Sequence, residues 1–74
     1  MPIQVGEASP PHRDERVAEF HVFHDGFVGV PAEIFRLNGR LMIAIYSREG
    51  REPWEFSLAE FVEAIGRGIS ILDG

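Results

Sequence analysis

The stretch EIFRLNGRLMIAIY, residues 33–46, decides the fold because it reads as two apolar strands joined by a two-residue turn. Asn38 and Gly39 both tolerate the positive φ angles of a type I′ turn, which matches the natural twist of the flanking strands. Such a turn also fixes the register of the hairpin. The expected pairs are Leu37 with Arg40, Phe35 with Met42, and Ile34 with Ile43.

A second hairpin is predicted directly upstream, in EFHVFHDGFVGV, residues 19–30. The residues on either side of Asp25-Gly26 alternate between two faces, and this dipeptide is a typical two-residue turn. Such a turn pairs His24 with Phe27 and Phe23 with Val28. Pro31 has no amide hydrogen to donate, so we expect it to end the strand or to mark a bulge.

The chain after residue 46 changes from strand to helix. PWEF, residues 53–56, can return as a meander strand with Trp54 and Phe56 on one face. Ser57 and Glu60 then form a capping box, which is typical of a helix start. Apolar residues follow at helical spacing and predict a helix from about residue 58 to residue 67; they are Leu58, Phe61, Val62 and Ile65.

The end of the chain is expected to leave the helix. Gly66 and Gly68 are residues that often stop a helix. The four residues after them, ISIL, are short, apolar and partly β-branched, as in a strand. Residues 69–72 are therefore predicted to form a short final strand.

Together these elements predict a small α+β protein. Its antiparallel sheet consists of two consecutive hairpins plus a meander strand and can curl into a partial barrel, with one C-terminal helix and the final strand. Residues 17–74 are expected to form a single domain. Residues 1–16, which hold three of the five prolines, are expected to form a flexible N-terminal arm.

Composition excludes several classes of protein. The net charge is −5, from twelve acidic and seven basic residues, and this disfavours a nucleic-acid binder because such proteins need a basic surface. No cysteine is present, so disulfides and thiolate metal sites are excluded. The N-terminus lacks a signal-peptide pattern, and no apolar run is long enough to cross a bilayer. We expect a cytoplasmic protein without a membrane partner.

Candidate chemistry begins with two histidines three residues apart. On a strand, His21 and His24 point to opposite faces and cannot bind one metal ion together. The serines lie in no nucleophile motif, and no phosphate-binding or dinucleotide motif is present. We therefore expect no enzyme activity, no metal and no cofactor. The alternatives are a small ligand- or metal-binding domain that uses His21, His24 and Trp54, and a sheet that binds RNA or single-stranded DNA weakly.

The second strand of the 33–46 hairpin is apolar on both faces. One helix covers only one of them, and the Ile34–Ile43 pair points to the aliphatic face. The opposite face then needs the N-terminal hairpin, barrel closure or another chain as its cover; it gathers Phe35, Leu37, Met42 and Tyr46. These residues predict a small acidic non-enzymatic protein-interaction module, a regulator or inhibitor of an unknown protein partner. We expect it to form a homodimer through this face or the sheet edge beside it.

Overall fold

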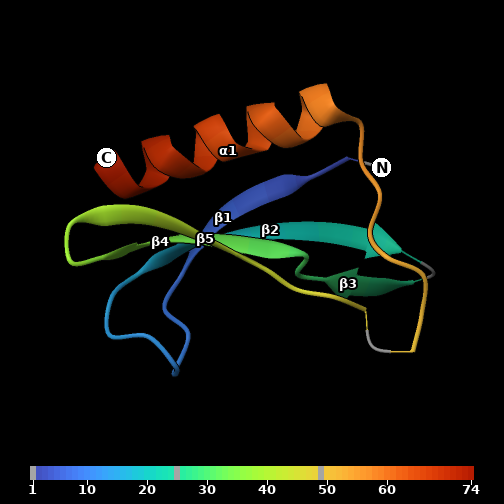
Figure 1. Ribbon diagram of the computed structural model, residues 1–74, viewed down its shortest axis with the longest axis horizontal. Coiled ribbons are helices and arrows are strands. Elements are labelled where there is room, and N and C mark those ends of the chain that lie inside the picture. Colours follow the sequence, from blue (N-terminus) through green and yellow to red (C-terminus); the bar gives the residue numbers. More distant parts are fainter. Residues whose placement is uncertain (1, 25, 49) are drawn as a thin grey trace.

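The protein is described by a computed structural model that covers residues 2–24, 26–48 and 50–74, with only the backbone of His24. The strands are β1 Gln4–Ala8, β2 Val17–His24, β3 Phe27–Gly29, β4 Ala32–Leu37 and β5 Arg40–Ile45, and the helix is α1 Leu58–Asp73. All strand pairs are antiparallel, in the order β1-β2-β4-β5, with β3 paired to β2. Figure 1 shows α1 lying along one face of this open sheet. The α+β class is confirmed.

Both predicted hairpin registers are confirmed. Leu37 pairs with Arg40, Phe35 with Met42, and Ile34 with Ile43. At the turn between them, Asn38 has a φ angle of 52° and Gly39 a φ angle of 78°, as a type I′ turn requires. In the upstream hairpin, His24 pairs with Phe27 and Phe23 with Val28, while Asp25 of its turn lies outside the described residues. The Asn38-Gly39 turn therefore fixes the downstream hairpin, and the upstream hairpin has the register expected of a two-residue turn.

The segment expected to be a flexible arm contains a strand. β1 pairs with β2 from Gln4↔His21 to Ala8↔Val17. Ile3 is buried in the core, and its carbonyl oxygen accepts a hydrogen bond from Arg67 at 3.0 Å. The expectation of irregular chain is wrong for these residues. Their apolar alternation, Ile3 and Val5, is too short to indicate a strand alone, and the partner strand β2 stabilises it.

The helix begins where predicted and ends later. The Ser57 hydroxyl oxygen accepts a hydrogen bond from the Glu60 amide at 3.0 Å, which confirms the cap. The predicted stop at Gly66 and Gly68 is wrong, and so is the final strand over residues 69–72, because α1 continues to Asp73. Gly68 is buried, and a Cβ atom there would stand 2.9 Å from Ile34 Cδ1. This glycine permits close packing of the helix on the sheet.

The predicted meander strand is also wrong, since residues 52–57 are not in a strand. The ring of Trp54 instead stacks on Phe56 with 6.4 Å between centroids, and Phe56 stacks on Phe61 at 5.8 Å. Phe61 meets Phe20 edge to face at 5.6 Å. These aromatic contacts continue the core from β2 through α1 to the connecting segment, so packing against rings replaces strand pairing here.

The core lies between α1 and the strands that it covers. Those strands are β1, β2 and β4, and β5 lies outside this cover. The buried apolar residues are Ile3, Ala18, Phe20, Val22, Ala32, Ile34 and Ala64. Among the described residues, α1 is the helix to consider as a membrane span, and it is neither long nor apolar enough. The uncovered edge strand β5 is the starting point for the functional site.

Candidate interaction surface

β5 exposes aliphatic side chains on the face of the sheet that carries α1. The side chain of Ile34 faces the helix, where it lies against Gly68. Ile43 is the direct partner of Ile34 on β5 and shares this face. Leu41 and Ile45 lie two residues from Ile43 and therefore share its face. The exposed fraction is 43% for Leu41, 40% for Ile43 and 70% for Ile45. An aliphatic stripe therefore remains exposed beside the helix.

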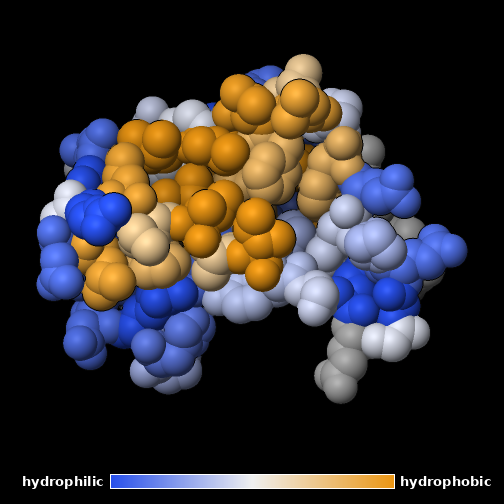
Figure 2. Space-filling view, viewed as in Figure 1, coloured by the Kyte–Doolittle hydropathy of each residue, from blue (hydrophilic) through white to orange (hydrophobic). Residues whose placement is uncertain are grey.

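A shallow apolar groove of about 170 Å³ separates this stripe from α1. Its lining consists of Ile34, Leu41, Met42, Ile43, Ile65 and Ile69. Val62 is three residues before Ile65, lies on the same side of the helix and is 57% exposed. Figure 2 shows apolar side chains gathered into one area over the helix and the sheet. The stripe and the groove form one surface, which we call the β5 surface.

The outer edge of β5 also presents backbone groups. In a hairpin closed by a two-residue turn, the flanking residues Leu37 and Arg40 exchange both hydrogen bonds. Alternation along β5 then directs the amides and carbonyls of Arg40, Met42 and Ala44 toward β4. Those of Leu41, Ile43 and Ile45 point away from β4, at the edge of the sheet. The same three residues therefore offer both apolar side chains and hydrogen-bonding groups.

The other edge of the sheet has a different character. On β1, Glu7 is exposed and forms an ion pair with Arg16 at 3.0 Å. Charged side chains on an edge strand discourage pairing with another chain. Residues 41–45 contain neither a charged residue nor a proline. β5 is thus the edge whose chemistry favours an added strand.

The four residues predicted as an interaction surface share the face opposite the helix. Phe35 is half-buried beneath Arg13, whose Cζ atom lies 3.4 Å from the ring centroid. Tyr46 donates a hydrogen bond to Glu33 Oε1 at 2.6 Å. Leu37 and Met42 are 54% and 37% exposed. The structure therefore brings the four onto one face, where Arg13 of the N-terminal loop already covers Phe35.

A buried carboxylate anchors that loop. Glu33 is 1% exposed, and its Oε1 atom lies 2.6 Å from the Tyr46 hydroxyl, 2.7 Å from Arg13 Nε and 3.2 Å from His12 Nε2. Burial acts to raise the pKa of Glu33, but the hydrogen bonds from Tyr46, Arg13 and His12 outweigh it and lower the pKa below its ordinary value. The sequence signal for this cluster was Glu33 itself, an acid on the same face as Phe35.

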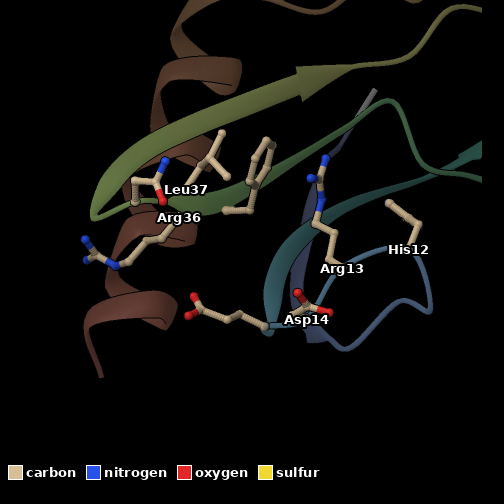
Figure 3. A pocket seen from close by; sticks show the side chains of 8 residues that line it. His12, Arg13, Asp14, Arg36 and Leu37 are labelled. Atoms are coloured by element: carbon tan, nitrogen blue, oxygen red, sulfur yellow. The ribbon is translucent and has the colours of Figure 1, made fainter.

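A polar cleft of about 330 Å³ lies between residues 12–15 of the N-terminal loop and residues 35–38 of the β4–β5 hairpin (Figure 3). Its lining includes Arg13 and Arg36, which could attract an anion. Arg13 is already paired with Glu33 at 2.7 Å, and Arg36 forms an ion pair with Asp73 at the end of α1. Both guanidinium groups therefore hold parts of the chain together, and the two arginines of this cleft have a structural role.

The predicted alternative site is not assembled in the described part of the chain. Glu19 and His21 lie two residues apart on the same face of β2, and His21 Nε2 is 3.0 Å from Glu19 Oε1. The His24 side chain lies outside the described residues. Trp54 packs at Gly29, within the aromatic core contacts. Among the described residues, no three His, Asp or Glu side chains are grouped to hold a metal ion.

Comparison with known proteins adds no relative to this picture. No family model matches the chain, no curated protein matches its sequence, and no solved structure matches its fold. A function is therefore inferred from the surfaces described above. The β5 surface combines exposed apolar side chains with a six-residue edge strand, whereas the edge strand β3, which exposes Phe27 and Val28, has three residues.

Proposed function

We propose that the protein is a small non-enzymatic interaction module that regulates or inhibits another protein and self-associates through the β5 surface. One observation carries the proposal: Leu41, Ile43 and Ile45 are 40–70% exposed on a strand at the edge of the sheet. Long apolar edges attract other strands, and proteins that stay monomeric usually cover or charge them. An exposed apolar patch of this kind is typical of an interaction site.

Both faces of β5 contribute to the proposed surface. Leu41, Ile43 and Ile45 lie on the helix side, while Met42 and Tyr46 alternate with them on the other side. A partner at this edge would therefore contact the aliphatic stripe and also the border of the face that holds Phe35 and Leu37. The surface predicted from the sequence joins the interface at this border.

The free energy that contacts at this edge can contribute is comparable with the cost of association. Burying a whole aliphatic side chain contributes about 1.5–3 kcal/mol, so the exposed parts of the three stripe residues together contribute about 3 kcal/mol per protomer. Each new backbone hydrogen bond adds about 1 kcal/mol. Association costs on the order of 4–15 kcal/mol in lost freedom of motion. We therefore expect a reversible complex whose population depends on protein concentration.

Light scattering over a range of protein concentrations tests the proposal. The mass of the parent protein should rise above that of the 8.3 kDa monomer. Ile45→Asp should keep the mass at the monomer value, because the interface would then bury a charge. Phe27→Asp is the matched control, since Phe27 on β3 is 71% exposed and Ile45 is 70% exposed. Phe27→Asp should associate like the parent. A parent that stays monomeric at every concentration contradicts the proposal.

A further inference from the structure

We infer that the occupant of the β5 edge is a second copy of this chain, whose own β5 pairs with it antiparallel about a two-fold axis at Ile43. The inference rests on the proposed self-association and specifies how the two copies meet. It follows from three features of the strand: the direction of its backbone groups, the pattern of its side chains, and the position of α1.

The backbone groups restrict the register. The outward amides and carbonyls belong to Leu41, Ile43 and Ile45, so these residues must pair among themselves across a two-fold axis. An axis at Met42 or at Ala44 would engage only two of the three. An axis at Ile43 pairs Leu41 with Ile45 of the second copy, and Ile43 with Ile43 of the second copy. This register engages every outward group.

The side chains are self-complementary in the same register. On the helix side, aliphatic residues meet aliphatic residues, and on the other side Met42 meets Ala44 of the second copy. Apolar cross-strand pairs of this kind stabilise a sheet, and like charges directly opposite would destabilise it. Arg40, the charged residue of β5, falls at the end of the pairing, opposite Tyr46 of the second copy. No like charges therefore face each other along β5.

The arrangement of layers also fits a pair. A two-fold axis perpendicular to the sheet keeps both helices on the same face, so the two apolar grooves beside α1 also lie on that face. The outer edges of the paired sheet are then β1, where Glu7 forms an ion pair with Arg16, and the three-residue strand β3. Charged side chains and very short edge strands both oppose further strand addition. The structure thus favours a closed dimer over an open fibre.

Single cysteines test this register because the chain contains no cysteine of its own. In a hydrogen-bonded antiparallel pair the two Cα atoms are about 5.5 Å apart, within the range that a disulfide spans. Ile43→Cys should therefore form a disulfide-linked dimer in a glutathione redox buffer. Leu41→Cys and Ile45→Cys are the matched controls. Each one alone places its two cysteines about 14 Å apart, which is too far for a bond.

Mixing the two control variants gives the decisive measurement. Leu41→Cys and Ile45→Cys should form a mixed disulfide dimer, because these positions are partners in the inferred register. A linked dimer of Met42→Cys without one of Ile43→Cys would place the axis elsewhere and overturn the register. A parent that is dimeric by light scattering while none of these pairs forms would overturn β5 pairing but leave self-association standing. A monomeric parent would overturn both.

Discussion

Replacing Gly68 with alanine tests how closely α1 packs on the sheet. Gly68 and Gly66 both lie within α1, and both were expected to end it. A Cβ atom added at Gly68 would stand 2.9 Å from Ile34 Cδ1 and 3.3 Å from Ala18 Cβ. A Cβ atom added at Gly66 would have no neighbour within 4 Å among the described residues. Comparison of Gly66→Ala with Gly68→Ala therefore separates the effect of packing on stability from the effect of helix propensity.

The expected magnitudes follow from two opposing effects. Alanine is favoured over glycine inside a helix by about 0.8–1.0 kcal/mol, and Gly66→Ala should gain most of that in its free energy of unfolding. Gly68→Ala has the same gain but must displace its neighbours. The Ile34 methyl can rotate away, whereas the Ala18 Cβ is fixed to a buried strand. Overpacking of this kind costs about 1–3 kcal/mol. We expect Gly68→Ala to be less stable than the parent by about 1 kcal/mol.

Urea denaturation followed by circular dichroism measures the difference. The slope for a domain of this size is about 1 kcal/mol per M, so the midpoint of Gly68→Ala should lie about 1 M below the parent and that of Gly66→Ala somewhat above it. All variants must be compared at one protein concentration, because association raises apparent stability. Equal stabilisation by both substitutions would refute the close contact between α1 and β2.

Two further predictions concern the helix cap and the buried carboxylate. Ser57→Ala should lower the free energy of unfolding by about 1 kcal/mol because the Glu60 amide loses its acceptor. Ser70→Ala, on the exposed side of α1, should not lower it. Equal urea midpoints for the parent and Ser57→Ala would contradict this cap. Because the pKa of Glu33 is lowered in the folded chain, the unfolded chain binds a proton at this group at a higher pH than the folded chain does. The stability that Glu33 contributes is therefore present above about pH 4.5 and is lost as the pH falls below that value. Thermal melting from pH 6 to about pH 3 should show this loss in the parent and a smaller one in Glu33→Gln, and identical pH profiles would contradict the role of the cluster.

The parts of the fold that follow from local chemistry could be predicted from the sequence. Asn38-Gly39 needs only its own backbone preferences to set the register of β4 and β5, and that register is observed. Ser57 needs only the amide three residues later to start α1. In both cases the residues that determine the structure are neighbours in the sequence. The prediction therefore does not depend on the rest of the fold.

The parts that depend on distant contacts could not be predicted in this way. β1 is short, and its hydrogen bonds come from β2, so its own residues contain little strand signal. A glycine such as Gly68 can end a helix or permit close packing within one. Only the approach of Ile34 and Ala18 shows that Gly68 has the second role. Trp54 and Phe56 alternate as in a strand, yet ring stacking determines their place. In each case the prediction followed a local preference, whereas a tertiary contact determines the structure.

The exposure of the proposed interaction surface depends on the same packing of α1 on the sheet. The sequence shows that β5 is apolar on both faces, but it does not show where the helix lies across the sheet. β1 widens the sheet on the side away from β5, and α1 packs on β1, β2 and β4, which leaves Leu41, Ile43 and Ile45 uncovered. The strand that enlarges the core of this small domain is thus also the reason that the opposite edge is exposed. Glu7 on β1 forms an ion pair with Arg16, whereas β5 has no charged residue between positions 41 and 45, and this difference favours the proposed association at the β5 edge.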